Sequence, residues 1–597
     1  MITKDWTLPE VIEKYPGTRR IFDEAGLHGC GGASGPHETV EFFSRVHGVP
    51  LEKLLGDLEA AKDAPAATYR EDLGDILYRR FFRAAILVIL TAGATLGASL
   101  LLLYGLRHSF TSLDLFAPIQ AHANAQVFGW VGLFVMGFAY QGLPRFKFVR
   151  LWRPDLANLS FVLMLSGLAL RMGASWPWAG QTALGLAGGC LEAAAATLFV
   201  VVIGRTLRES RSRDEWDKYV IASLACFLII ALLEPVVFWL TRPGLEVERL
   251  TGRVATFMGP YRNLQLLGFA GLIILGVSQR ILPTAFGFRQ PGKGVANLVF
   301  ILLTAGLAVD LVGWGAFRVA HSPVWALVSW VGTSAYASGA LLLAWSLRAF
   351  TWGDRDRSSK FIRAAYLWMA VACLMVFAEP FYTQALGLRF SHAYHGAIRH
   401  AFTVGFISLM ILGVSSKVVP ILGGIEAGGL PSLWIPFVLV NTGNAMRVTF
   451  QVLTDVIPGT AFPVMGASGT LEVAGLAIWG VHLWRLLGRR TAELGGSALS
   501  PLRITADMKV SDIADWYPAL LDVFERYGFK ELRNPLLRRT LARRVTVRMA
   551  CDLKQVREVD FLEALNGTLG RTFTSAPAGM KEENPAPACS HPEGVQR

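Results

Sequence analysis

Three histidines stand within nine residues of the segment FSHAYHGAIRH, at the start of an apolar run: His392, His395 and His400. An imidazole nitrogen is costly to bury in lipid unless it is hydrogen-bonded or binds a ligand. Neutral imidazole is a common ligand of haem iron and of copper. The spacing therefore predicts a cofactor or metal site at the mouth of a membrane-spanning helix.

A fourth histidine, His122, begins another apolar run in the same way. When the two runs are aligned, His122 and His400 lie at nearly the same depth. At about 100° per residue around a helix they lie about 160° apart, which suits two neighbouring helices that approach one haem from opposite sides. We predict that His122 and His400 are axial haem ligands. The alternative is that each imidazole is hydrogen-bonded inside the helix bundle.

The spacing of His392 and His395 puts them on one face of a helix if that helix begins early. They are then candidates for a second haem or a copper ion. His395 is also counted with His122 and His400 among the candidate metal ligands, although it points about 140° away from His400 on a regular helix. A solvated loop outside the membrane explains His392 and His395 equally well.

Charged residues within or beside the apolar runs are further candidates. Arg262 and Arg399 precede equivalent runs; a guanidinium suits a carboxylate such as a haem propionate, or it extends to the membrane interface. Glu234, Glu379 and Asp310 are the evident intramembrane carboxylates. They are candidates for proton transfer or for a quinone site. Support of a helix kink is the alternative, since a proline follows each of the two glutamates.

A second candidate site lies near the N-terminus, in HGCGGASGPH, where Cys30 stands close to His37. A cysteine flanked by glycines can approach a metal or be oxidised. One cysteine with one or two histidines is a weak metal signal, and a plain turn is the alternative. The six cysteines include no CxxC pair, so we expect no covalently attached haem.

The elements that position these residues are predicted from composition. The chain has 597 residues, 53% hydrophobic and only 17% charged, whereas a soluble protein carries about a quarter charged residues. We predict an all-α polytopic membrane protein, because apolar runs of about 20 residues recur twelve times. The predicted spans are 84–106, 118–141, 156–174, 181–204, 219–241, 259–282, 295–319, 324–347, 362–384, 397–421, 432–453 and 466–486.

Basic loops indicate the orientation. Segments such as RFKFVRLWRP and RDRSSKFIR fall on one side of the predicted membrane, which is therefore expected to be cytoplasmic. The exception is TRPGLEVERLTGR, on the other side. Both termini are then cytoplasmic and the three-histidine segment is periplasmic. The net charge of +12 is accounted for by these loops, and we expect no nucleic-acid partner. The N-terminal segment has no apolar stretch of the signal-peptide kind.

Two repeats organise the chain. The segments 2–26 and 504–528 share seven residue identities at a spacing of 502. They predict two small helical domains, 1–78 and 500–570, around a membrane domain of 79–490, with a disordered tail at 571–597.

The second repeat lies within the membrane domain and implies three four-helix arcs around a pseudo-threefold axis; chance alignment of small residues is the alternative. It matches Gly129, Leu133, Gly137 and Pro144 with Gly268, Leu272, Gly276 and Pro283, and with Gly405, Leu409, Gly413 and Pro420.

These motifs carry a resemblance. HANAQVFGWVGLFVMGFAY is similar to the second helix of subunit I in the haem–copper oxidase and nitric oxide reductase superfamily. RNLQLLGFAGLIILGVSQRILP and RHAFTVGFISLMILGVSSKVVP resemble NnrS-type membrane proteins more closely. The N-terminal segment resembles DUF1858-type small helical domains. The resemblance implies one or two b-type haems, with copper as a further possibility, in the inner membrane of a bacterium, and a role in nitric oxide metabolism in denitrification.

One departure limits this implication. In the oxidases and reductases the sixth and seventh helices supply metal-binding histidines, but here spans 259–282 and 295–319 contain none. Nitric oxide chemistry, if it occurs, then needs an open haem position with His392 or His395 as the ligand. Whether the chain is an oxidoreductase is left open. The alternatives are a membrane electron-transfer protein that takes electrons from quinol or a redox protein without gas chemistry, and a transporter or scaffold without haem.

Overall fold

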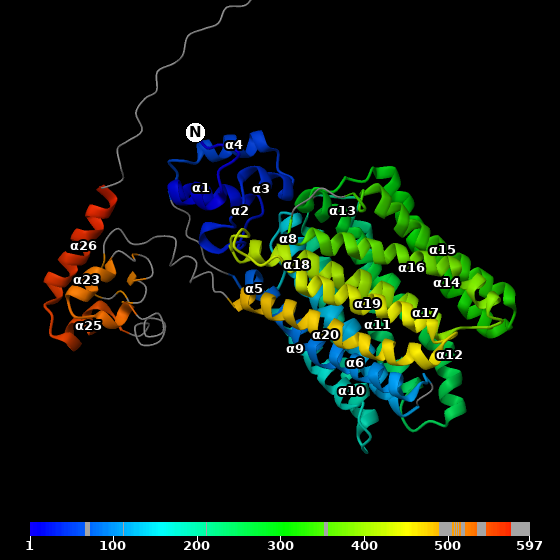
Figure 1. Ribbon diagram of the computed structural model, residues 1–597. Helices are drawn as coiled ribbons and strands as arrows, with labels where there is room; N and C mark the ends of the chain where they lie inside the picture. The colour runs from blue at the N-terminus through cyan, green and yellow to red at the C-terminus, as the bar shows by residue number, and fades with distance from the viewer. Residues whose placement is uncertain are drawn as a thin grey trace, which may run out of the picture. The chain divides into compact units, whose positions relative to one another are not determined.

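The computed structural model describes residues 1–65, 72–110, 113–210, 212–351 and 356–488, scattered positions from 504 to 520, and then 521–533 and 545–574. Most of the predicted tail 571–597 lies outside the described residues. The described residues are mainly helical, as predicted, and an isolated β-bridge joins Thr7 and Thr39. They divide into two compact units, 1–491 and 492–597 (Figure 1).

Residues 1–60 form a small helical module, which we call the N-terminal module. Thr7 begins its first helix with a capping box, in which the Thr7 hydroxyl and the Glu10 carboxylate each bind the other residue's backbone N–H. Arg19 is buried and donates hydrogen bonds to the carbonyl groups of Gly32 and Ala33, so it holds the glycine-rich turn in place. The helices are α1 (Leu8–Lys14), η1 (Pro16–Thr18), α2 (Arg19–Glu24), η2 (Gly32–Ser34), α3 (Val40–His47) and α4 (Leu51–Ala60).

The C-terminal unit contains a second copy of this module. Gly26 and Gly528, which are 502 residues apart, have nearly the same left-handed backbone, with φ of 92° and 90°. Phe22 and Phe524 are both fully buried. The repeat predicted between the two ends is thus present in the backbone and in the core. The described helices of this copy are α23 (Leu521–Arg526), η9 (Lys530–Arg533), α25 (Val547–Lys554) and α26 (Glu558–Thr574).

Eleven helices among the described residues are long and apolar enough to cross a membrane. The remaining predicted span, the eleventh, forms α19 (Trp434–Leu453), whose 20 residues are also long enough to cross but which carries several polar side chains. The eleven are Leu73–Arg107, Phe116–Phe146, α9 (Pro154–Gly173), α10 (Gln181–Glu209), α11 (Asp217–Leu240), Val247–Phe286, α14 (Lys293–Ala320), α15 (Pro323–Ser346), α16 (Ser359–Ala385), His392–Leu422 and α20 (Pro458–Gly488).

Several helices begin earlier than predicted, and two of these extensions bear on the candidate site. The span predicted at 259–282 extends back to Val247, so part of the charged segment TRPGLEVERLTGR is helical, and the span predicted at 397–421 extends back to His392. The first extension carries arginine and glutamate, which are good helix formers, and the second begins at Ser391, whose hydroxyl accepts a hydrogen bond from the Tyr394 N–H and so caps the helix. His392 and His395 are therefore helical residues, and a loop does not describe them.

The second, sixth and tenth spans, which we call the inner helices, are each interrupted by eight residues of π-helix. The three interruptions begin 139 and 137 residues apart, at the spacing of the sequence repeat. An extra residue in a helical turn is a costly feature, so its threefold recurrence supports true repetition over chance alignment. The segments are α7 (Phe116–Asn124), η5 (Ala125–Gly132) and α8 (Leu133–Phe146); α12 (Val247–Asn263), η6 (Leu264–Gly271) and α13 (Leu272–Phe286); and α17 (His392–His400), η7 (Ala401–Ser408) and α18 (Leu409–Leu422).

The first span has an interruption of its own. It consists of α5 (Leu73–Val88), a five-residue π-helical segment η3 (Ile89–Gly93) and α6 (Ala94–Arg107), and the short turn η4 (Leu113–Leu115) follows it. Gly93 leaves helical geometry, with ψ of −108°. This irregular turn matters because its carbonyl group faces the site described below.

The repeat continues into the outer hairpins, in which α9 packs on α10, α14 on α15 and α19 on α20. A Cβ atom added at Gly167, Gly306 or Gly443 would come within 2.7 to 3.0 Å of a backbone carbonyl oxygen of the partner helix. Only glycine allows this close approach. The residue four positions later in each repeat is charged and buried: Arg171, Asp310 and Arg447.

The N-terminal module packs on one end of the inner helices, and we call that membrane face the module side and the opposite face the far side (Figure 1). The Gly31 N–H donates to the carbonyl oxygen of Leu422 at 3.1 Å. The Arg280 guanidinium donates to the carbonyl oxygen of Val46 at 2.7 Å. The module thus contacts the ends of both α13 and α18.

Candidate functional site

A cavity of about 470 Å³ lies towards the far side of the bundle, among the first, second, sixth, tenth, eleventh and twelfth spans. This volume falls in the range of small-molecule and cofactor sites, about 300–1,000 Å³. Most of its lining residues are apolar. Its polar side chains include five predicted site residues, namely His122, Arg262, His392, Arg399 and His400.

The imidazoles of His122 and His400 are held in the same tautomer. The Nδ1 atom of His122 lies 2.9 Å from the carbonyl oxygen of Gly93, and the Nδ1 atom of His400 lies 2.9 Å from that of Gly396. A carbonyl oxygen only accepts, so each Nδ1 must carry the proton. The Nε2 lone pair of each imidazole is then free, and a neutral imidazole held in this way is the usual form of a histidine metal ligand.

Gly97 provides the surface on which the His122 ring rests. A Cβ atom at Gly97 would lie 2.4 Å from Cε1 of His122. The imidazole therefore packs directly on the backbone of α6, and any side chain at position 97 would displace it. The sequence gives no signal for this role, because it depends on which helix lies beside which.

Three arginines line the cavity, and none forms an ion pair among the described residues. Arg262 donates to the amide oxygens of Gln120 and Gln265 at 2.7 and 2.6 Å. The Nε of Arg399 and the Nε and Nη1 of Arg447 are buried without a hydrogen-bond partner in the part of the chain that the structure describes. Buried guanidinium groups without partners are costly. Guanidinium groups of this kind can bind carboxylates.

His392 and His395 separate. His392 lines the cavity, whereas the Nδ1 of His395 lies 3.6 Å from the Glu379 carboxylate, outside the cavity. Asp310 accepts hydrogen bonds from Asn263 at 2.8 Å and from Ser329 at 2.6 Å. Glu379 and Asp310 therefore have local partners and do not face the cavity.

Glu234 belongs to a buried cluster of charges beside the cavity. Its Oε1 accepts from Arg171 at 2.8 Å and its Oε2 accepts from the Tyr261 hydroxyl at 2.6 Å. Asn124 donates to both Glu192 and Glu234, at 2.9 and 3.2 Å. One arginine thus serves two carboxylates.

The sequence analysis named Glu234, Glu379 and Asp310 as the evident intramembrane carboxylates, and this list was too short. Glu192 is also buried inside a span, and Glu472, which is half-buried, lines the cavity. The signal was present, since any ionisable residue within an apolar run is a functional candidate.

Cys30 and His37 have different surroundings. Cys30 is buried in the interface between the module and the bundle, where its thiol lies 3.7 Å from the carbonyl oxygen of Ile421. Burial raises the pKa of the Cys30 thiol to about 11, so the thiol stays protonated at neutral pH and is a poor metal ligand. His37 is exposed. The plain turn explains the segment better than a metal site does.

Within the described ranges, no group of three or more histidine, cysteine, aspartate or glutamate side chains is placed to hold a metal ion. The described residues therefore offer no three-ligand copper centre. A haem needs only one or two protein ligands, so this finding does not bear on haem.

The fold and the site define a polytopic helical membrane protein with a cavity lined by imidazole and guanidinium groups. A family model described as NnrS protein matches residues 77–490, so the chain belongs to the NnrS family. A second model, for a domain of unknown function called DUF1858, matches residues 2–55 and 504–562. No curated protein matches the chain.

Proposed function

We propose that this protein is a haem b-binding membrane protein that acts in nitric oxide metabolism or resistance. The NnrS family is linked to the response to nitric oxide. The observation that carries the proposal is the pair His122 and His400, each with Nδ1 committed to a carbonyl group and Nε2 free in one cavity. The unpartnered arginines of that cavity support a ligand with two carboxylates.

The residues of the chain then have distinct roles. His122 and His400 would hold the haem through Nε2, and Gly93 and Gly396 orient the two imidazoles through their carbonyl groups. Arg399 and Arg447 would bind its propionates. Haem supplies reversible one-electron chemistry and, where an axial position is open, a binding place for a small gas. Copper is a weaker proposal, since the described residues offer it fewer ligands.

A second function is favoured by the same pair. Two imidazoles in one cavity suit a haem with both axial positions filled, which passes electrons and does not bind gas. In that case the protein transfers electrons from quinol or a redox protein, and gas chemistry needs His392, the remaining histidine in the cavity. Addition of nitric oxide to the reduced protein separates the two functions. A changed haem spectrum supports gas binding, and an unchanged spectrum supports electron transfer alone.

The test of haem binding is the haem content of purified protein from haem-replete cells. We expect b-type haem with a six-coordinate, low-spin spectrum, and most of it should be lost in His122→Ala and His400→Ala. The control is His321→Asn, in an exposed turn with φ of 52° that asparagine tolerates; it should keep its haem. Wild-type protein without haem, or equal haem in all variants, refutes the assignment.

We also propose that the module side is cytoplasmic in a bacterial inner membrane. Loops rich in lysine and arginine follow α8 and α10, and the module that α13 and α18 contact is on the same side. Such loops are retained in the cytoplasm. A reporter that works only in the cytoplasm should be active when fused after residue 597, and a reporter that works only in the periplasm should be inactive there. The reverse result refutes the orientation.

A further inference from the structure

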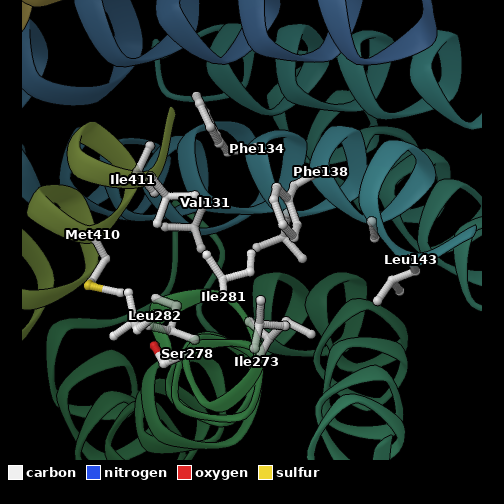
Figure 2. A pocket seen from close by; sticks show the side chains of 15 residues that line it. Val131, Phe134, Phe138, Leu143, Ile273, Ser278, Ile281, Leu282, Met410 and Ile411 are labelled. Atoms are coloured by element: carbon white, nitrogen blue, oxygen red, sulfur yellow. The ribbon is translucent and has the colours of Figure 1, made fainter. Parts of the chain in front are cut away.

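A second cavity lies on the pseudo-threefold axis, between α8, α13 and α18, with a volume of about 90 Å³. Its lining follows the repeat, because each inner helix contributes the same three positions. Figure 2 shows Phe138, Ile273 and Met410 around this space. The axial cavity is therefore a product of the symmetry of the bundle. The three sets are Phe134, Ile273 and Met410; Val135, Ile274 and Ile411; and Phe138, Val277 and Val414.

The wall of the axial cavity is apolar. Ser278 is the one polar side chain among its lining residues. A buried water molecule needs two to four polar partners, so a space of this kind stays dry and binds small apolar molecules instead. An open apolar cavity also costs stability, and one larger side chain at any of the nine positions would reduce it.

The axial cavity adjoins the cavities on both sides of it. Val131 lines both the axial cavity and the far-side cavity that contains His122 and His400. Phe138 and Ile281 line both the axial cavity and a third cavity of about 100 Å³, under the N-terminal module. A single layer of side chains thus separates the axial cavity from each neighbour.

We propose that the axial cavity binds a small uncharged gas and exchanges it with the far-side cavity. A diatomic molecule fits the volume and needs no hydrogen bond, whereas an ion or a polar substrate would lose its hydration here. The choice of nitric oxide as the natural gas rests on the proposed function. The existence of the binding site rests on the cavity alone.

Xenon is the probe for the site, because it binds dry apolar cavities. Crystals of the purified protein under xenon pressure should show a xenon atom among Phe134, Ile273 and Met410. Val277→Phe should remove this atom and Phe138→Ala should increase its occupancy. The matched control is Val162→Phe, the same change at an exposed position of α9, and it should leave the xenon in place. A wild-type crystal without axial xenon overturns the proposal, as does xenon that persists unchanged in Val277→Phe.

The connection is tested with Val131→Trp, which adds bulk between the axial and far-side cavities. Crystals frozen after a short exposure should show less axial xenon than wild-type crystals, and crystals frozen after a long exposure should show the same. Equal filling at both times overturns the exchange with the far-side cavity. Neither measurement needs haem, so failure of the haem assignment and failure of the gas site are distinguishable.

Discussion

At the scale of residues, the geometry of His122 depends on a glycine that carries no chemistry itself. Gly97 lets the imidazole pack on the backbone of α6. Gly97→Val should displace the ring and lower the haem content, while the fold is kept. The control is Gly204→Val, where an added Cβ would meet no atom within 4 Å. Haem content per folded protein measures both, and an unchanged value in Gly97→Val would contradict the role of Gly97.

Arg399 is expected to have opposite effects on the empty and the loaded protein. Its Nε is buried without a partner among the described residues, and an unsatisfied buried polar group costs about 1–3 kcal/mol. Arg399→Leu should therefore raise the melting temperature of the haem-free protein and weaken its binding of haem. The control is Arg389→Leu, at an exposed position, which should change neither quantity. A lower melting temperature in the haem-free Arg399 variant would contradict the idea that its partner is the ligand.

At the scale of elements, the internal repeat could be predicted from the sequence, because small residues recur where helices pack closely. The glycines of the inner helices and Gly167, Gly306 and Gly443 recur at the same spacing. The alignment of two runs predicted that His122 and His400 lie at similar depth, and both line one cavity. The π-helical segments could not be predicted from the sequence, since the extra residue in each turn is visible only in the backbone hydrogen bonds of the structure. The separation of His392 from His395 was also hidden, because it depends on the carboxylate of Glu379 from another helix.

The cluster around Arg171 should contribute strongly to stability. Arg171 and Glu234 are buried, with a separation of 2.8 Å, and removal of one partner of a buried pair costs about 3–5 kcal/mol. Arg171→Met should lower the free energy of unfolding by about that much, because it also leaves Glu192 without a nearby cation. Arg153→Met, in an exposed pair with Asp155, should have a much smaller effect, because solvent screens the attraction between exposed charges. The double variant Arg171→Met with Glu234→Gln should recover part of the loss, and no recovery would contradict the pairing.

At the scale of the whole molecule, both terminal modules and the membrane bundle could be predicted from composition and repeats. The docking of the N-terminal module could not, since it depends on contacts such as that between Arg280 and the Val46 carbonyl group. These contacts join segments more than 200 residues apart. No local sequence pattern indicates such contacts. The motifs that identify the two modules are common to both copies, so they do not predict that the N-terminal copy docks on the bundle.

Docking of the N-terminal module should weaken in acid. Burial lowers the pKa of His47 to about 3 and, with a smaller effect of Arg145, that of His28 to about 4, against about 6.5 in an unfolded chain. Below about pH 6.5 the unfolded module binds protons that the folded module excludes, so stability falls as the pH is lowered towards 4. The penalty from His47 alone is about 2 kcal/mol at pH 5.

Hydrogen exchange of residues 1–60, corrected for intrinsic rates, measures this effect in the full protein. Protection should decrease from pH 7 to pH 5 in the wild type and decrease less in His47→Phe. The ring of Phe43, stacked on His47 at 4.1 Å, is positioned to pack on the replacement. The same loss of protection in both proteins would show that other groups set the pH dependence.

The unpaired arginines of the far-side cavity also have a consequence for the biogenesis of the protein. Arg262, Arg399 and Arg447 share the cavity with a single carboxylate, that of Glu472. A chain that closes its helices around these charges without counter-anions holds an energetic cost that a dianionic ligand removes. The empty protein is therefore expected to be the short-lived form in the cell, cleared by quality control. The supply of ligand during membrane insertion, and not the rate of translation, then sets how much of the protein accumulates.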